Sequence, residues 1–208
     1  SENKVVIDGK ATDTEWKNVT HLKNFFSPWE ESVPQNTEFK AFYNAEYLFF
    51  LFNVIDTSKV CLDTIRVEHD ITREDRVEIF LTADLTLKSY YCLEIDGKGR
   101  ILDYFASYYR KFEDGWNLEG LEVEGKYKNN NHYTVEGAIP LKKIQELFNV
   151  NQVKNSNLFI GLFRADLSFN SDSIINEQWV SWVDIKSVIP DFHIPQAFCR
   201  LSFNNDKY

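Results

Sequence analysis

The 208-residue chain contains no methionine, three cysteines, eight glycines and five prolines. The absence of methionine argues against a haem-binding electron-transfer domain, because such domains commonly use methionine as one axial ligand. Cys61, Cys92 and Cys199 are too widely spaced for the paired cysteine motifs of zinc sites and thiol–disulfide exchange centres. At least one thiol is free because the count is odd. Cys92 and Cys199 lie in strand-like runs, which favour buried, reduced side chains.

Long apolar runs and common catalytic motifs are also missing. No segment approaches the roughly 20 apolar residues of a membrane-spanning helix. The chain has no Gly-x-Ser-x-Gly nucleophile turn, no His-Glu-x-x-His zinc motif and no glycine-rich phosphate loop. Its formal net charge of -9 disfavours binding to phosphate backbones. We therefore expect no catalytic residues, no membrane span and no nucleic acid partner.

Aromatic residues are abundant, with 17 Phe, 10 Tyr and 5 Trp, and they favour strands and offer flat faces for stacking a ligand. In the first half of the chain, Val77, Ile79 and Leu81 alternate with residues that include Arg76 and Glu78. This period of two predicts a strand whose aliphatic face packs into a core. The charged face has two interpretations: a solvent-exposed Arg–Glu pair, or the floor of a polar groove of the size of a sugar.

Short segments of this kind recur along the chain, and turn residues separate roughly a dozen of them. They include strands predicted at residues 5–7, 37–43 and 133–140. A helix is predicted at residues 141–148, where apolar residues share one face. Strands and helices do not alternate as in parallel α/β proteins. We therefore predict an all-β fold, an antiparallel β-sandwich of jelly-roll or immunoglobulin-like type with one short helix, as a single domain over residues 1–208.

Several landmarks follow one another along the chain in a distinctive order. They are Val6-Ile7-Asp8-Gly9 with Trp16, residues 37–43, 75–80, 133–140 and 163–166, Ser181-Trp182, and residues 192–195 with Phe198. In this order, over nearly the whole chain, they closely resemble the family 9 carbohydrate-binding modules. The resemblance implies a non-catalytic β-sandwich that binds an oligo- or polysaccharide. The best-known members bind the reducing ends of β-linked sugars, as in cellulose and xylan.

The resemblance further implies a site in which two aromatic residues clamp a sugar ring while polar groups bind its hydroxyls. Phe192 stands at the second clamp position, where the family often has tryptophan, and Glu78 stands at an acidic position that contacts the sugar. Thr72 or Arg73 stands where the first clamp tryptophan would lie, so one wall of the clamp is missing. Glu94 stands where cellulose-binding members carry arginine, so the resemblance does not identify the sugar that is bound. Three tryptophans in predicted loops could replace the missing wall: Trp29, Trp116 and Trp179.

We predict a ligand site in which Glu78, Glu94 and Arg164 form a polar rim. Phe192 is the stacking platform of this site, and His193 lies beside it. Structural alternatives exist for the same residues. Arg164 could instead neutralise the two glutamates from an adjacent strand, and Phe192 could pack into the core.

The resemblance also implies a structural calcium ion, the one cofactor we consider. Hard oxygen ligands are plentiful around Asp56, Asp63 and Asp70, but they lack EF-hand spacing, so we assign no ligands. Related modules are often appended to xylanases, which makes a larger polysaccharide-degrading system a possible partner. The chain begins at Ser1 without methionine, which is compatible with a removed export signal, and we expect an extracellular or periplasmic location.

Two alternatives to glycan binding are open from the sequence. A β-sandwich of this type could bind a protein partner or support a larger assembly, which a large exposed aromatic patch without polar groups around it would favour. Hydrolysis of a glycosidic bond needs two carboxylates on either side of that bond, and Asp75, Glu78 and Glu94 are candidates. Asp75 and Glu78 are three residues apart, however, so a strand directs them to opposite faces.

Overall fold

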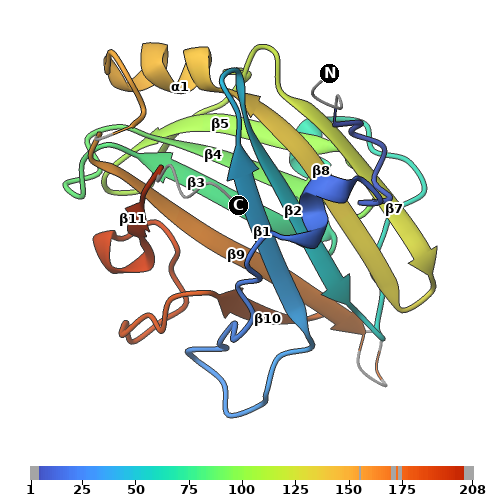
Figure 1. Ribbon diagram of the computed structural model, residues 1–208. Coiled ribbons are helices and arrows are strands. Elements are labelled where there is room, and N and C mark those ends of the chain that lie inside the picture. The colour runs from blue at the N-terminus through green and yellow to red at the C-terminus, as the bar shows by residue number, and fades with distance from the viewer. Residues whose placement is uncertain (1–4, 155, 170–171, 173–174, 204–208) are drawn as a thin grey trace.

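Two antiparallel sheets form a β-sandwich in the computed structural model, which describes residues 5–154, 156–169, 172 and 175–203 (Figure 1). The smaller sheet has the order β1-β2-β8-β7, with β1 Thr37–Tyr43, β2 Tyr47–Ile55, β8 His132–Pro140 and β7 Glu122–Asn129. The larger sheet has the order β10-β9-β3-β4-β5-β6, and β11 also pairs with β9. Its strands are β10 Ile175–Ser181, β9 Leu158–Phe169, β3 Arg76–Thr82, β4 Tyr90–Asp96, β5 Ile101–Ser107, β6 Lys111–Glu113 and β11 Cys199–Leu201. The predicted fold class is confirmed.

The local predictions hold in most places. Helix α1 spans Leu141–Phe148, as predicted, and ends at Asn149, which has a left-handed backbone conformation with φ 50°. Short 3₁₀ turns lie at η1 Thr14–Lys17, η2 Glu68–Arg73 and η3 Pro195–Ala197. Two predictions are wrong: residues 5–7 form no strand, and Trp179 lies in β10 rather than in a loop.

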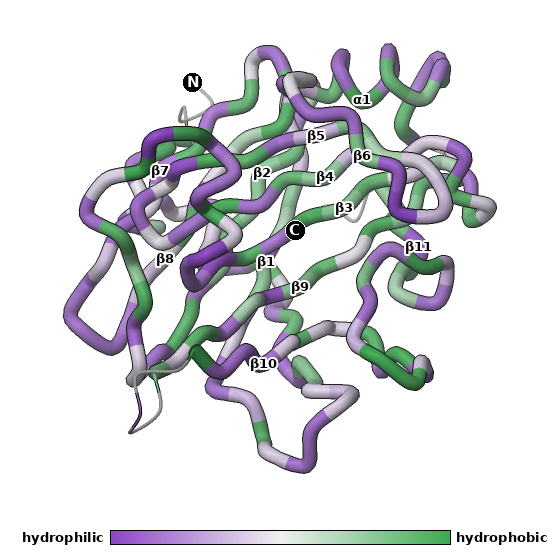
Figure 2. The backbone as a smooth tube through the Cα atoms, turned by 180° about the vertical axis from the view of Figure 1, so that it is seen from behind, coloured by the Kyte–Doolittle hydropathy of each residue, from purple (hydrophilic) through white to green (hydrophobic). Residues whose placement is uncertain are grey.

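Strand β3 shows how the sequence pattern becomes two packed faces. Val77, Ile79 and Leu81 point into the core between the sheets. Phe80, on the opposite face, packs against a second cluster that includes Ile71 and Phe198 from the segments outside the sheet. All seven residues of β3 are buried, so the charged face of this strand is covered by loops and is not an open surface. Figure 2 shows that much of β3 is green, whereas the long connections around the edge of the sandwich include many purple segments.

The N-terminal segment covers the outer face of the smaller sheet. Glu136 in β8 is fully buried and accepts hydrogen bonds from the Gly9 backbone N–H at 2.9 Å and the Trp16 Nε1–H at 2.7 Å. Trp16 also packs edge-on against Phe42 of β1, with ring centroids 4.7 Å apart. A buried carboxylate that accepts several N–H groups is satisfied without a cation. The outer face of the larger sheet is therefore the one left for a recessed site.

Arg164 lies in the interior between the two sheets. Its position in β9 is paired with Val77 of β3, so its side chain shares the inward face of that residue. The guanidinium lies 3.4 Å from the Asp56 carboxylate and 3.0 Å from the Asp166 carboxylate, and it donates to the Ile55 carbonyl at 3.1 Å. This position corrects the expectation that Arg164 lines a ligand rim or neutralises Glu78, because neighbouring positions on a strand face opposite sides.

Two further sequence features can be read from the described residues. None of the helices in them is long and apolar enough to span a membrane. All three cysteines lie in the described part of the chain and are unpaired. Cys92 is fully buried, and burial raises its pKa well above the usual value. A buried, protonated thiol of this kind serves packing and is unreactive.

Replacing Arg164 with alanine should lower the free energy of unfolding by about 3–5 kcal/mol, because it leaves the Asp56 and Asp166 carboxylates buried without their cation. Urea unfolding at neutral pH measures the change. Arg200→Ala is the matched control, since Arg200 is exposed, and its effect should stay within about 0.5 kcal/mol. Equal small effects of both substitutions would contradict a structural role for the Arg164 ion pairs.

Candidate functional site

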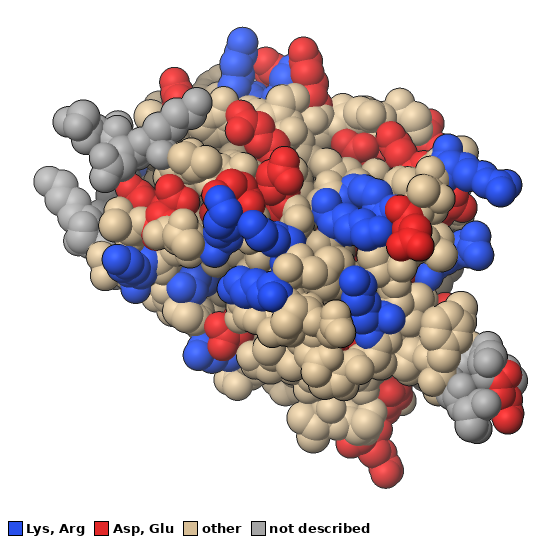
Figure 3. All heavy atoms as spheres, turned by 90° about the vertical axis from the view of Figure 1, so that its right-hand side faces the viewer, with Lys and Arg blue, Asp and Glu red and all other residues tan. Residues whose placement is uncertain are grey.

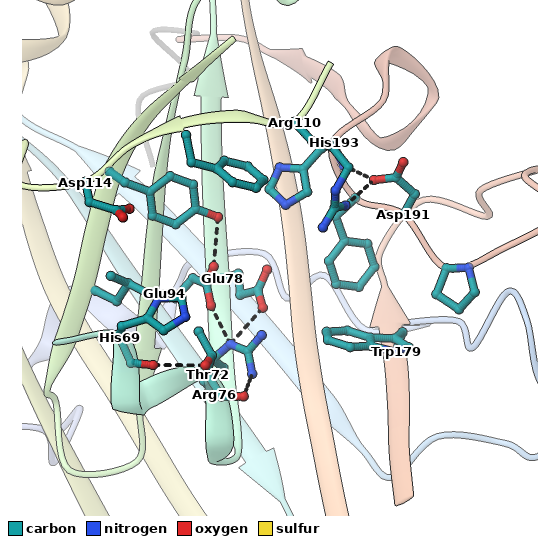
Figure 4. Close-up of a pocket in the computed structure, with 15 residues that line it drawn as sticks. His69, Thr72, Arg76, Glu78, Glu94, Arg110, Asp114, Trp179, Asp191 and His193 are labelled. Atoms are coloured by element: carbon teal, nitrogen blue, oxygen red, sulfur yellow. Dashed lines mark hydrogen bonds and ion pairs between the residues drawn. The ribbon is translucent and has the colours of Figure 1, made fainter. Parts of the chain in front are cut away.

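A cavity of about 300 Å³ lies on the outer face of the larger sheet (Figure 4). Strands β3, β4 and β5 supply its floor through Arg76, Glu78, Glu94 and Tyr104. Trp179 of β10 and the loop that follows β10 supply one wall, and the end of the β5–β6 hairpin supplies another. We call it the primary cavity. Its residues come from distant parts of the chain and meet only because these strands are neighbours in the sheet.

One guanidinium holds two carboxylates at the floor of the primary cavity. The Arg76 Nε lies 2.5 Å from a Glu94 carboxylate oxygen and 3.1 Å from a Glu78 carboxylate oxygen. The glutamates meet because the antiparallel register places Glu78 directly opposite Glu94. The Tyr104 hydroxyl donates to the other Glu94 oxygen at 2.8 Å, and an Arg76 N–H donates to the Thr72 carbonyl at 3.1 Å. All three side chains of the ion-pair group are at most 7% exposed.

The electrostatics of this group favour a proton on Glu78. Burial and the nearby Glu94 carboxylate raise the pKa of Glu78 to about 8, although Arg76 partly opposes them. At neutral pH Glu78 is therefore mostly a neutral carboxylic acid beside the Arg76–Glu94 ion pair. A neutral carboxyl can donate one hydrogen bond and accept another, which suits a ligand hydroxyl.

Trp179 is the aromatic wall of the primary cavity. Its ring lies 5.6 Å from the Arg76 guanidinium carbon, and it meets Phe192 edge-on with centroids 5.6 Å apart. Phe192 itself stacks on Phe163 at 4.1 Å and is only 5% exposed. Phe192 thus lines the cavity but gives its ring face to the core, and the expectation of an open stacking platform at this position is wrong. Trp29 also contacts Phe192, and the centroids of the two rings are 5.8 Å apart.

The loop with His193 is fixed by the β5–β6 hairpin. Arg110 lies 3.0 Å from the Asp191 carboxylate, which also accepts a 2.6 Å hydrogen bond from the Tyr109 hydroxyl. The His193 ring stacks on Phe80 at 5.0 Å and is within 3.1 Å of the Tyr90 hydroxyl. Burial and the Arg110 charge lower the pKa of His193 to about 4, so the imidazole is neutral at pH 7. Contacts within the protein therefore hold this wall of the cavity in place.

The structure brings together four of the five residues predicted from the sequence: Glu78, Glu94, Phe192 and His193. Their contacts with a ligand stay predictions. Sequence reasoning did not assign a ligand role to Arg76, although the period of two already placed it on the face of Glu78. Trp179 was one of three open candidates, and its place in an edge strand beside the loops explains why no local pattern singled it out.

The family resemblance implies a structural calcium ion, and the described residues contain one group of carboxylates that could serve as its ligands. Asp56, Asp75 and Asp166 form the one group of three potential ligands found among the described residues. The Arg164 guanidinium already lies against Asp56 and Asp166. Both Asp75 oxygens accept backbone N–H groups, one of them from Leu167 at 2.7 Å. The group therefore does not fit a calcium site, because a cation and two N–H donors take the positions that an ion would need.

This geometry defines a β-sandwich module with a recessed polar site over one sheet. Residues 7–205 match the family model described as carbohydrate family 9 binding domain-like. The chain belongs to this family, as the sequence landmarks predicted. A search of curated proteins returns no significant match.

Solved structures share the fold at low sequence identity. A protein described as carbohydrate-binding, from Bacteroides uniformis ATCC 8492, has a TM-score of 0.68 and 16% identity over 89% of this chain and 87% of its own. A family 9 module from Caldicellulosiruptor kristjanssonii in complex with glucose has a TM-score of 0.58 and 18% identity over 99% and 95%. A family 9 module from the same organism in complex with cellotriose has a TM-score of 0.57 and 17% identity over 98% of this chain and 92% of its own. At such identities the likeness establishes the fold alone.

The raised pKa of Glu78 predicts a stability that falls as pH rises. The folded protein keeps this proton up to about pH 8, whereas the unfolded chain loses it near the ordinary value of 4.5. The free energy of unfolding should therefore fall by more than about 1 kcal/mol between pH 5.5 and pH 8.5. Asp75, whose pKa burial and the Asp56 charge raise to about 8, contributes in the same direction.

Urea unfolding across this range tests the assignment with Glu78→Gln, which should reduce the slope without removing the contribution of Asp75. Glu122→Gln, at an exposed position of β7, is the matched control and should leave the slope unchanged. A Glu78→Gln variant with the slope of the parent would refute a buried proton at this site.

Proposed function

We propose that this protein is a non-catalytic module that binds the end of an oligo- or polysaccharide in the primary cavity. The observation that carries the proposal is the pairing of an indole wall with planar polar groups. Trp179 stands beside the floor made by Arg76, Glu78 and Glu94. A pyranose has an apolar face that stacks on an aromatic ring and hydroxyls that pair with carboxyl and guanidinium groups.

Chain ends, rather than internal sugar units, fit the shape of this cavity. Its floor is closed by side chains at most 7% exposed, and we infer that a terminal unit enters the cavity from its open side. Family 9 modules from Caldicellulosiruptor kristjanssonii are described in complexes with glucose and with cellotriose, which supports a glucan or a similar β-linked glycan as ligand. We extend the proposal to cellulose or xylan ends, in an extracellular or periplasmic polysaccharide-degrading system.

The match to a family of carbohydrate-binding modules supports non-catalytic binding over hydrolysis. Both carboxyl groups already pair with the Arg76 guanidinium, and Glu94 also accepts from Tyr104. Groups held in this way are suited to fixed hydrogen bonds with a ligand. A nucleic acid would need a continuous positive surface. On the face in Figure 3, basic side chains lie close to acidic ones.

Titration calorimetry of the purified protein tests the proposal. The probes are xylo-, cello-, manno- and galacto-oligosaccharides, each intact and with the reducing end converted to the alditol, with calcium or with EDTA. We expect at least one series to bind and to lose binding on reduction, if the bound end is the reducing one. Binding that survives reduction would point to the other chain end or to internal units. A folded protein that binds no member of the panel would refute glycan binding.

Trp179→Ala should weaken binding of the ligand found in this way by about tenfold or more, because it removes the stacking wall. Trp116→Ala is the matched control, since Trp116 lies beside Tyr91 and does not line the cavity, and affinity should stay within about twofold. Circular dichroism confirms that both variants fold. Equal affinities of the two variants would place the ligand elsewhere.

A further inference from the structure

A second, larger cavity lies next to the primary one. It is an open, groove-like space of about 870 Å³ that runs along the edge strand β10, between the loop that precedes β1 and the loop that follows β10. Trp179 and Pro190 line both cavities, so the two spaces meet at this indole and this proline ring. We call the second space the edge cavity.

The chemistry of the edge cavity differs from that of the primary cavity. Its polar lining is largely neutral and consists of amides and hydroxyls: Ser32, Gln35, Ser58, Ser168, Asn176 and Gln178. The charged residues among the described residues that line it are all acidic, namely Glu30, Asp166 and Glu177. An anion would find no cation there to bind it. Amides and hydroxyls beside two indoles suit a neutral ligand rich in hydroxyl groups.

The lining of the edge cavity is ordered by hydrogen bonds within the protein. The Gln178 amide donates to the Ser32 hydroxyl at 2.6 Å, which ties β10 to the loop before β1. The Trp29 indole N–H donates to the Ser187 carbonyl and hydroxyl, both at 3.1 Å. That indole therefore has its one donor satisfied and keeps its ring for packing. A lining fixed before binding loses little conformational entropy when a ligand arrives.

The two cavities together match a chain of several sugar units. The primary cavity is the smaller, and its floor is closed by the Arg76 ion pairs, whereas the edge cavity has nearly three times its volume. We propose that the edge cavity is an extension subsite. The terminal sugar lies in the primary cavity, the glycan chain crosses at Trp179, and the neutral units that follow lie in the edge cavity. This inference rests on the proposed function and adds to it a preference for longer glycans.

Exposed aromatic rings elsewhere offer a competing route for the glycan. Tyr108 and Tyr109 at the end of the β5–β6 hairpin are 50% and 47% exposed, but they line neither cavity. Because they line neither of these two cavities, we expect them to contact only one side of a sugar chain. Tyr108→Ala therefore separates the two routes, because it should not affect binding if the chain follows the edge cavity.

The test is the dependence of affinity on chain length, measured by calorimetry with cello- and xylo-oligosaccharides of one, two, four and six units. For the series that binds, we expect the parent to bind the six-unit chain more tightly than the two-unit chain. The double variant Asn176→Ala/Ser168→Ala removes polar groups of the edge cavity alone, from facing positions of β10 and β9. It should lose about 3- to 10-fold in affinity for the six-unit chain and less than about twofold for two units.

The matched control is Asn151→Ala/Ser89→Ala, which removes the same two side-chain types outside both cavities and should behave like the parent. Equal affinity of the parent for two and six units would overturn the extension subsite and leave the proposed function standing. So would equal losses of the double variant for both lengths, or a selective loss in Tyr108→Ala. If the parent binds no chain of any length, the proposed function itself fails.

Discussion

The ion-pair group of Arg76 with Glu78 and Glu94 is the constraint on which the candidate site depends. Two glutamates directly opposite each other on neighbouring strands cannot both be buried and charged without a cation between them. Arg76 supplies that cation from the same face of β3, while the remaining charge is reduced by the proton that Glu78 retains. The surrounding loops leave this group at most 7% exposed, and a cavity of about 300 Å³ lies above it on the outer face of the larger sheet.

A second arginine between two carboxylates lies on the other face of the same sheet, where it has a structural role. Arg164 also sits between two carboxylates, Asp56 and Asp166, but it lies between the sheets, where the space is filled. Arg76 and Arg164 belong to adjacent strands, β3 and β9. A shift of one position along the strand decides whether a buried arginine serves the fold or forms part of a cavity.

Much of the fold could be predicted from local patterns, and part of the site could as well. The alternation in β3 correctly assigned Val77 to the core, and the apolar spacing of Leu141–Phe148 correctly assigned the helix. Arg164 was misplaced because alternation defines two faces within one strand but does not relate them to the faces of the next strand. Phe192 was misjudged because its partner Phe163 is far away in the sequence.

The sequence by itself determined the strand periods, the helix, the sandwich class and the family, because these depend on side-chain spacing and on the order of motifs along the chain. Tertiary structure alone decided which charged residues share a cavity, which tryptophan forms its wall, and that a second cavity adjoins it. Trp179 and Arg76 are 103 positions apart, and only the pairing of β10 with β9 and of β9 with β3 brings them together. Register and loop packing are non-local, so no local pattern in a single chain records them.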